Sequence, residues 1–405
     1  MREKVRILFV AMSGSVHTAR WISQINDQNW DIHLFPSQDE GIVHPELKNM
    51  TVHHSVYNTR NHKNRNLTIR GIPVPSQLLA LSLRRLLQET IPRYRHIQLK
   101  RLIEKLKPDI VHSMEIQHAG YLTLDVRKSF PHGRFPAWIV SNWGSDIYLY
   151  GRLSGHVSKI REVLGACDYY SCECRRDVGL AQSMGLEGKV LPVLPNTGGY
   201  DLVRINSLIQ PEPTSKRRMI LLKGYQGLFG RALVGLRAIG MCAKWLQGYR
   251  VAIYSASKDE TVKIAAEILH QDTGLPVEII PPCTHDDMLR LYGQARIYLG
   301  LSISDAISTS LLESMVMGTF PIQSNTSSAD EWIADGKTGF IVPPEDPEQI
   351  AQAIRRAVTE DELVDKAAHI NAHTARERLD ISIVKPQVIA MYQQIFAQSQ
   401  KRNPA

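Results

Sequence analysis

Short apolar runs alternate with longer amphipathic stretches along almost the whole chain, and this alternation constrains the fold more than any other feature. The runs at residues 5–12, 109–112 and 138–141 have the length of buried strands. Strands that alternate with helices form parallel sheets, because each crossover helix covers one face of the sheet. We therefore predict an α/β protein built on doubly wound parallel sheets.

A polar, proline-containing stretch at residues 211–218 interrupts the alternation, which restarts with a strand at residues 219–222. We predict two Rossmann-like domains, at residues 1–205 and 206–383. The last segment, 384–405, carries an amphipathic helix that we expect to pack back on the first domain. Ligands of such sheets bind beyond the carboxyl ends of the strands, and we expect the site in the cleft between the domains.

The net charge of +8 is concentrated in one segment of the chain. Residues 1–205 have a balance of +9 and residues 206–405 a balance of −1, while residues 60–107 alone carry 12 basic and 2 acidic side chains. The basic side chains interleave with leucine and isoleucine, which is typical of helices that lie on an anionic membrane surface. The solvated face of an ordinary core-packed helix has the same pattern, and both interpretations stay open.

Three further classes are excluded or disfavoured. No nucleic-acid partner is predicted, because aromatic residues are few and no known binding motif is present. No apolar run approaches the roughly 20 residues that cross a bilayer, and the N-terminus is more typical of a first strand than of a signal peptide. The five cysteines match neither a disulfide framework nor a zinc pattern. We expect a cytoplasmic protein, with peripheral attachment to the inner face of the membrane if the basic segment binds lipid.

The most informative stretch follows the predicted strand at residues 297–301 and reads SDAISTSLLE over residues 304–313. A strand end that leads into a helix offers free backbone N–H groups and the helix dipole to an anion such as phosphate. Asp305 and Glu313 can face the same ligand, and carboxylates accept hydrogen bonds from sugar hydroxyls. A capped helix with a solvated glutamate explains the same spacing.

This stretch resembles the E-x7-E motif of the retaining glycosyltransferases of family 4, the group 1 transferases. The similarity extends over about fifty residues, through ESMVMGTFPI at 313–322, EWIADGKTGFIVP at 331–343 and DPEQIA at 346–351. The resemblance implies the two-domain GT-B fold and a nucleotide-diphospho-sugar as the donor.

The same resemblance implies a role for each residue of the motif. Glu313 would hold the ribose hydroxyls of the donor, and Asp305 would lie near the hydroxyls of its sugar. The backbone of Ile307, Ser308 and Thr309 would face the diphosphate. The family usually has glutamate at the position of Asp305, whose side chain is one methylene shorter.

A second constellation, LKGYQGLFGRA at residues 222–232, places one cation at each end of a glycine-rich loop. Lys223 and Arg231 can neutralise a phosphate there. The family has G-R-x-x-x-x-K-G at this place, and an ungapped match puts Tyr225 at its arginine and Gly230 at its lysine. We predict that Lys223 and Arg231 replace that pair as a phosphate clamp. A solvated lysine beside a structural arginine is the alternative.

Glycine permits a close backbone approach to a ligand, which makes Gly224 of this loop and Gly14 of the first loop candidate substrate contacts. Residues 13–17, SGSVH, resemble the family's first glycine loop, G-G-x-x-x-H, with one glycine in place of two. His17 is a candidate contact by this resemblance, or a histidine of the first helical turn without a function.

A further loop, SNWGSDI at residues 141–147, resembles the family's H-G-x-D loop, which lies near the acceptor. Trp143 replaces the usual histidine, and Gly144 follows it. Asp146 either orients an acceptor hydroxyl or caps the next helix, and the sequence does not decide between the two.

No metal ion and no cofactor are predicted. His112, Glu115 and His118 do not have the HExxH spacing that puts two histidines on one helix face. An Asp-x-Asp pair for a metal–nucleotide complex is not evident, so side-chain cations would take its place. The nucleotide sugar is a substrate.

These patterns predict a retaining hexosyltransferase that moves a sugar to a hydroxyl of a glycan or lipid-linked acceptor, in cell-envelope polysaccharide biosynthesis. The mechanism that the resemblance implies is attack from the face that the diphosphate leaves, with the leaving phosphate taking the proton. Lys223, Arg231, Asp305 and Asp146 are the candidate catalytic residues. A GT-B nucleotide-sugar epimerase and a non-catalytic, membrane-associated subunit of the glycan machinery remain alternatives.

Overall fold

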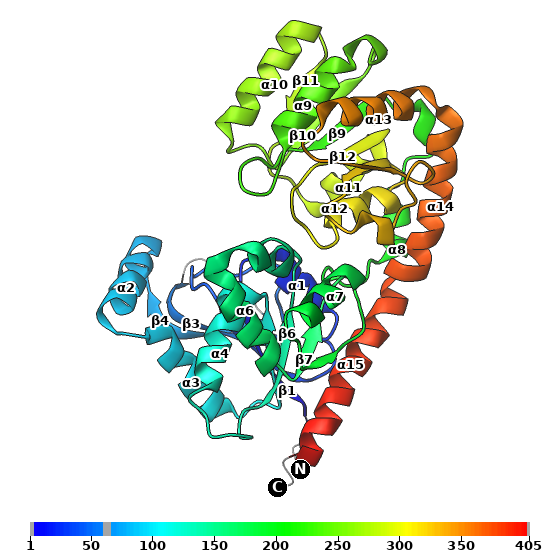
Figure 1. Cartoon of the computed structure of the whole chain (residues 1–405). Coiled ribbons are helices and arrows are strands. Elements are labelled where there is room, and N and C mark those ends of the chain that lie inside the picture. Colours follow the sequence, from blue (N-terminus) through cyan, green and yellow to red (C-terminus); the bar gives the residue numbers. More distant parts are fainter. Residues whose placement is uncertain (1–3, 60–65, 403–405) are drawn as a thin grey trace. The chain divides into compact units, whose positions relative to one another are not determined.

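The computed structural model describes residues 4–59 and 66–402, and the chain divides into two compact units. Unit 1 combines residues 1–199 with residues 384–405, and unit 2 comprises residues 200–383. Each unit is built on one parallel sheet with helices packed against it (Figure 1). The predicted α/β class with doubly wound sheets is confirmed.

The sheet of unit 1 has the order β4-β3-β2-β1-β5-β6-β7-β8, and all neighbouring strands in it are parallel. Its strands are β1 (Arg6–Ala11), β2 (Asp31–Pro36), β3 (Met50–Asn58), β4 (Leu67–Val74), β5 (Ile110–Met114), β6 (Ala137–Ser141), β7 (Tyr169–Ser171) and β8 (Lys189–Val190). Its helices are α1 (Val16–Ser23), α2 (Gln77–Thr90), α3 (Tyr94–Leu106), α4 (Tyr121–Arg127), α5 (Ser145–Tyr148), α6 (Ser154–Ala166) and α7 (Arg175–Ser183).

Strand β1 illustrates how the sequence produces a sheet that is buried on both faces. Successive side chains of a strand point to opposite faces. Ile7 and Phe9 enter one apolar cluster, and Leu8 and Val10 enter the cluster on the other face. All four side chains are fully buried, which explains why the segment is continuously apolar rather than alternating.

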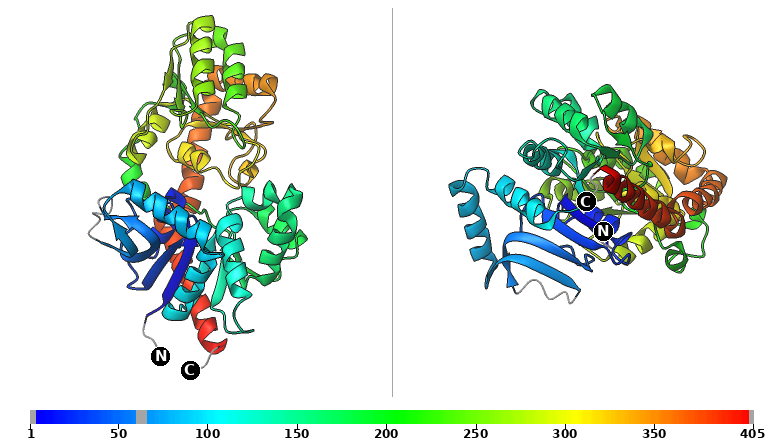
Figure 2. Two further views of the ribbon diagram at one scale, coloured as in Figure 1. Left: turned by 90° about the vertical axis from the view of Figure 1, so that its left-hand side faces the viewer. Right: turned by 90° about the horizontal axis from the view of Figure 1, so that it is seen from below.

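The last helix, α15 (Ile381–Arg402), completes the core of unit 1 (Figures 1 and 2). Its inward side chains join the same cluster as Ile7 and Phe9. The Tyr392 hydroxyl accepts a hydrogen bond from Trp21 Nε1 at 2.8 Å and lies 2.7 Å from His112 Nδ1. The inward positions of α15 are Val384, Val388, Met391, Tyr392 and Ile395.

The sheet of unit 2 has the order β11-β10-β9-β12-β13-β14 and is also parallel. Its strands are β9 (Met219–Lys223), β10 (Arg250–Tyr254), β11 (Val277–Ile279), β12 (Ile297–Gly300), β13 (Phe320–Ser324) and β14 (Phe340–Val342). Its helices are α8 (Leu202–Asn206), α9 (Ala232–Met241), α10 (Glu260–Thr273), α11 (His285–Gln294), α12 (Thr309–Val316), α13 (Pro347–Thr359) and α14 (Asp361–Leu379).

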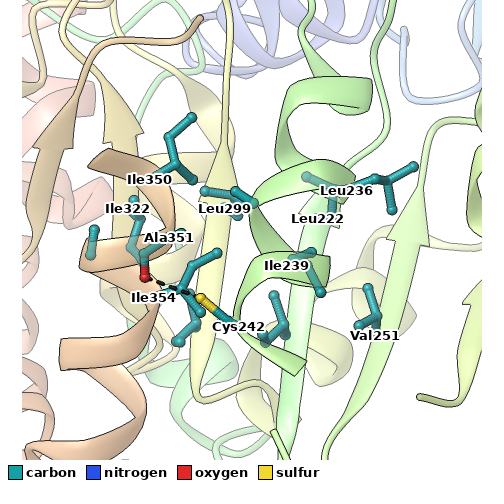
Figure 3. Packing of buried hydrophobic residues seen from close by; sticks show 14 of the residues in the cluster. Leu222, Leu236, Ile239, Cys242, Val251, Leu299, Ile322, Ile350, Ala351 and Ile354 are labelled. Atoms are coloured by element: carbon teal, nitrogen blue, oxygen red, sulfur yellow. Dashed lines mark hydrogen bonds between the residues drawn. The ribbon is translucent and has the colours of Figure 1, made fainter. Parts of the chain in front are cut away.

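The core of unit 2 forms where α9 and α13 pack on one face of this sheet (Figure 3). Leu236 and Ile239 of α9 meet Ile350 and Ile354 of α13 over the strands. The Cys242 thiol lies 3.1 Å from a backbone carbonyl of α13. This packing fixes the strands whose carboxyl ends carry the predicted motifs.

Several elements differ from the sequence-based expectation. Strand β4 and the elements β14 and α14 were not predicted. Within the basic segment the chain forms two helices, α2 and α3, which are separated around Pro92. No helix in the described parts of the chain is long and apolar enough to cross a membrane.

Candidate functional site

The order of the strands defines a topological switch point in unit 2. The chain builds the sheet outward from β9 in one direction and from β12 in the other, and the loops after these neighbours start at the same edge of the sheet, where such sheets bind their ligands. Lys223 is the last residue of β9, and residues 301–308 follow β12. Both predicted motifs of the second half therefore lie at this topological switch point.

Backbone hydrogen bonds hold these two motifs together. Gly230 and Ser302 form an antiparallel bridge. The backbone N–H of Arg231 donates to the carbonyl of Leu301 at 3.1 Å, and that of Ile303 donates to the carbonyl of Phe229 at 2.8 Å. The glycine-rich loop and the loop before α12 thus form one continuous surface, although they are some seventy residues apart in the sequence.

Lys223 supplies the positive charge of this surface. Burial acts to lower the pKa of its ammonium group, but Tyr298, Asp305, Tyr225 and Glu313 outweigh that effect and raise the pKa. The Nζ atom lies 4.8 Å from the centre of the Tyr225 ring. Lys223 is therefore a protonated, half-buried cation that faces the two carboxylates of the E-x7-E-like motif.

Glu313 lies in the second turn of α12, and its side chain is only 8% exposed. His285, the first residue of α11, places Nε2 2.8 Å from Glu313 Oε1. This contact fixes the carboxylate of a residue that the resemblance assigns to ribose binding. No local pattern in the sequence connects His285 with a residue 28 positions further on, so this contact was not predicted.

The beginning of α12 offers backbone donors. Within the described residues, the N–H groups of Ile307, Ser308 and Thr309 have no backbone acceptor. Ser308 occupies the N-cap position without a capping hydrogen bond from its side chain. Asp305 Oδ1 accepts the N–H of Ala306 at 2.9 Å. Free N–H groups at a helix N-terminus stabilise an anion.

Arg231 lies in a different environment from Lys223. Its Nε is 2.8 Å from Glu345 Oε1, and its NH1 donates to the carbonyls of Gly227 and Gly230 at 3.0 and 2.8 Å. The guanidinium thereby closes the glycine-rich loop on itself. The structure brings Lys223, Asp305 and Glu313 together, and it engages Arg231 in the support of the loop.

The structure also explains why the family's lysine position is a glycine here. A Cβ atom on Gly230 would lie 2.0 Å from the carbonyl oxygen of Tyr225. A Cβ atom on Gly224 would lie 2.6 Å from the Cβ atom of Ala256. Both positions require glycine because other atoms occupy the space of a side chain.

In unit 1 the corresponding switch point lies between β1 and β5. The loop with Gly14 follows β1, and Ser15 caps α1 by accepting the N–H of His17 at 3.2 Å. The rings of His17 and Trp143 lie 5.5 Å apart, centre to centre. Two of the predicted loops of the first half therefore meet at one edge of the sheet.

Asp146 is a buried residue that contacts the loops around it. Its Oδ2 accepts the N–H of Trp143 at 2.9 Å and that of Ile116 at 3.3 Å. Gly144 adopts a φ of 90°, which only glycine adopts without strain. Asp146 lies within the short helix α5, whose N-cap is Gly144, so its carboxylate braces the preceding loop instead of capping the helix. Its role toward an acceptor hydroxyl stays a prediction.

Glu115, after β5, is a second buried carboxyl group near Asp146. Its carboxylate accepts the N–H groups of His118 and Ala119, and its own φ is 104°, an unusual value for a residue with a side chain. Burial raises the pKa of Glu115, and the charge of Asp146 raises it further. Burial likewise raises the pKa of Asp146.

These shifts predict a pH dependence of stability. Because the folded pKa of Asp146 is higher than its usual value, the folded state loses stability as the pH rises through that pKa. We expect the unfolding free energy of the wild type to fall relative to Asp146→Asn by about 1–2 kcal/mol between pH 5 and 8. The pKa of Asp346 is lowered, so Asp346→Asn serves as the control and should show no such trend. Parallel urea-denaturation profiles for wild type and Asp146→Asn would contradict the assignment.

The histidines near Glu115 have structural contacts. His112 is fully buried between Tyr392 and the Ser141 hydroxyl, 2.7 Å from each. Across the ranges that the structure describes, no cluster of three or more histidine, cysteine, aspartate or glutamate side chains has a metal-binding arrangement.

Models of two glycosyltransferase families match the chain, one in each half. The family model of the group 1 glycosyl transferases matches residues 244–374. The model of the glycosyl transferase 4-like domain matches residues 6–96 and 80–166. A D-inositol 3-phosphate glycosyltransferase from Nocardioides is 26% identical over 118 residues, which are 27% of this chain and 26% of that relative. The match thus spans about a quarter of that relative's length.

Solved structures resemble the chain over nearly its full length. Sucrose-phosphate synthase from Thermosynechococcus elongatus matches with a TM-score of 0.70 and 14% identity, covering 98% of this chain and all of that one. Anabaena HepE in complex with UDP-glucose matches with a TM-score of 0.67 and 12% identity, covering 96% and 99%. These likenesses confirm the predicted GT-B fold. The two family models together span well over half of the sequence, and the chain belongs to the group 1 glycosyltransferases of the GT-B fold.

Proposed function

We propose that the chain transfers a sugar from a nucleotide-diphospho-sugar to a hydroxyl of a glycan or lipid-linked acceptor, with retention of the anomeric configuration. The observation that carries the proposal is the arrangement at the switch point of unit 2. A protonated lysine, free amides of α12 and two carboxylates line the same edge of the sheet. A diphosphate needs the first two kinds of group, and a sugar or ribose needs the third.

Each group then has a separate role. Lys223 and the amides of Ser308 and Thr309 stabilise the negative charge that develops on the leaving diphosphate. Glu313, oriented by His285, accepts hydrogen bonds from the ribose. Asp305 contacts the hydroxyls of the transferred sugar.

Arg231 supports the loop that carries these contacts rather than acting as half of a clamp. Its ion pair with Glu345 and its bonds to two loop carbonyls favour this reading. No metal ion or cofactor is assigned a role.

Unit 1 would supply the acceptor loops, with Gly14, His17, Trp143 and Gly144 nearest the acceptor. The leaving phosphate takes the proton of the attacking hydroxyl, so the reaction requires no strong protein base. Retention and the setting in envelope polysaccharide biosynthesis rest on the resemblance to group 1 enzymes. The complex of HepE with UDP-glucose supports a nucleotide sugar as the donor.

A donor screen followed by product analysis tests the proposal. Thermal shift of the full chain against UDP-, GDP- and ADP-sugars should select one donor. Transfer from that donor to a simple acceptor should give a product whose anomeric proton, observed by NMR, has the configuration of the donor. Absence of any shift, an inverted product, or an epimerised donor without an acceptor would each contradict the proposal.

A further inference from the structure

Helix α2 has an unusual distribution of apolar and charged side chains. Four of its six leucines are exposed, with Leu78 at 78% and Leu86 at 53%, whereas Arg84 is only 3% exposed. A helix that faces water on one side normally buries its leucines and exposes its arginines. The apolar side chains of α2 therefore face outward.

Neighbouring segments extend this outward apolar surface. Ile72 in β4 is 52% exposed and Ile91, directly after α2, is 37% exposed. Helix α2 and β4 lie together at the outer edge of the sheet of unit 1 (Figures 1 and 2). We call this set the α2 surface, and its members are Ile72, Leu78, Leu79, Leu81, Leu86 and Ile91.

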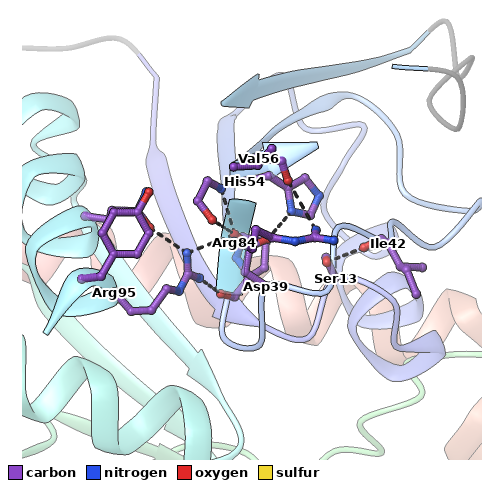
Figure 4. Close-up of polar contacts among 11 residues, drawn as sticks. Ser13, Asp39, Ile42, His54, Val56, Arg84 and Arg95 are labelled. Atoms are coloured by element: carbon purple, nitrogen blue, oxygen red, sulfur yellow. Dashed lines mark hydrogen bonds and ion pairs between the residues drawn. The ribbon is translucent and has the colours of Figure 1, made fainter. Parts of the chain in front are cut away.

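The inner side of α2 is attached to the unit by specific contacts (Figure 4). Arg84 NH1 donates to the carbonyl of Val56 at 3.3 Å, and it packs so close to Gly41 that a Cβ atom there would lie 1.8 Å away. Ala80 joins a small apolar cluster below the helix. These contacts of Arg84 fix the rotation of α2 about its own axis. The exposed leucines therefore lie on the outer face of the helix. They do not belong to an inner face that has moved away from the unit.

Positive charge surrounds the α2 surface. Arg70 and Arg93 are exposed beside it, while Arg85 forms an ion pair with Glu89 of the same helix at 2.7 Å. The described part of the basic segment, residues 66–107, contains only two acidic residues, Glu89 and Glu104. Residues 60–65 of the predicted basic segment lie outside the described residues. Exposed leucines among arginines suit an interface that is apolar below and anionic at its surface. A bilayer that contains anionic lipid has both properties, and a second basic copy of this chain has only the first.

We infer that the α2 surface docks on an anionic membrane, with the leucines entering the boundary between headgroups and acyl chains and the arginines contacting lipid phosphates. The inference rests on the exposed side chains of unit 1 and is independent of the chemistry proposed for unit 2. It predicts that binding needs both the apolar and the basic side chains.

Co-sedimentation of the full chain with vesicles tests the inference. Vesicles of phosphatidylglycerol and phosphatidylcholine, 1:1, should bind the wild type, and vesicles of phosphatidylcholine alone should bind it at least about tenfold more weakly. The triple variant Leu78→Ser, Leu81→Ser, Leu86→Ser should lose about tenfold or more in affinity for the anionic vesicles. Arg70→Glu with Arg93→Glu should lose a similar factor.

Matched controls come from other surfaces of the chain. Ile264 and Ile268 of α10 are 60% and 54% exposed, so Ile264→Ser with Ile268→Ser should leave vesicle binding unchanged. Arg161→Glu with Arg237→Glu changes the net charge by the same amount as the arginine variant and should have a much smaller effect. Circular dichroism and donor hydrolysis report separately on folding and on unit 2.

Three outcomes would overturn the inference. One is equal binding to both kinds of vesicle. Another is an equal loss of binding in the test and control variants. The third is a concentration-dependent dimer, seen by light scattering, that the leucine variant abolishes while vesicle binding stays undetectable, which would assign the α2 surface to a second copy of this chain.

Discussion

Replacement of Lys223 by methionine should lower kcat for sugar transfer by about 10²–10³-fold, the usual cost of removing one group that stabilises transition-state charge. Lys223 is the cation that faces Asp305 and Glu313. Methionine keeps the length and the apolar stem of the side chain but removes the charge. The effect should appear in kcat more than in KM, because negative charge on the diphosphate increases as the bond to the sugar breaks.

Arg231→Met is the matched comparison for this experiment. Its guanidinium is engaged by Glu345 and by two carbonyls of its own loop, so we expect a loss in kcat of less than about tenfold together with a lower thermal stability. Steady-state kinetics of both variants with the selected donor measure the two losses of kcat. Equal losses of kcat in the two variants would show that Lys223 and Arg231 act together as a phosphate clamp. An unchanged kcat in Lys223→Met would show that the lysine does not stabilise the leaving diphosphate.

Gly230→Ala should destabilise the chain by about 3 kcal/mol or more, which is a large effect for the addition of one methyl group. The new Cβ atom would lie 2.0 Å from the carbonyl oxygen of Tyr225 and 2.2 Å from its carbonyl carbon. Backbone atoms cannot rotate away as a side chain can, so the bridge between Gly230 and Ser302 would have to break. Urea denaturation and thermal unfolding measure the loss.

Gly227→Ala is the control, since it lies in the same loop. Gly227 has no atom within 4 Å of the added Cβ but has a φ of 94°. Its cost is therefore backbone strain alone, about 1 kcal/mol. Similar destabilisation in both variants would show that the close contact at Gly230 relaxes. The same contact implies that the family's lysine cannot be restored at position 230 by a single substitution.

Most of the fold follows from local patterns in the sequence. The elements that were not predicted are those whose residues lack the usual pattern of a strand or a helix. Strand β4 contains Gly71 and Pro73, which resemble a loop, but an edge strand tolerates both because its outer backbone groups need no partner. Helix α14 buries alanines and Asn371 along its inner face, so its sequence lacks the leucine-rich stripe that marks a helix.

The same limit applies to the site. Lys223, Asp305 and Glu313 were predicted because their motifs are local, and the order of the strands brings them together. His285 was missed because its contact with Glu313 joins residues that are 28 positions apart, and no spacing in the sequence reveals it. Glu345, the ion-pair partner of Arg231, lies 114 residues away, so no pattern in the sequence reveals this contact.

The contribution of α15 to unit 1 has a consequence for synthesis on the ribosome. A domain usually folds as soon as its chain has emerged, the N-terminal one first. Here residues 200–383 can complete their core while Trp21 and His112 still lack Tyr392. The second unit should therefore reach its native state before the first, and nascent chains halted before residue 384 should present the uncovered apolar face of unit 1 to chaperones.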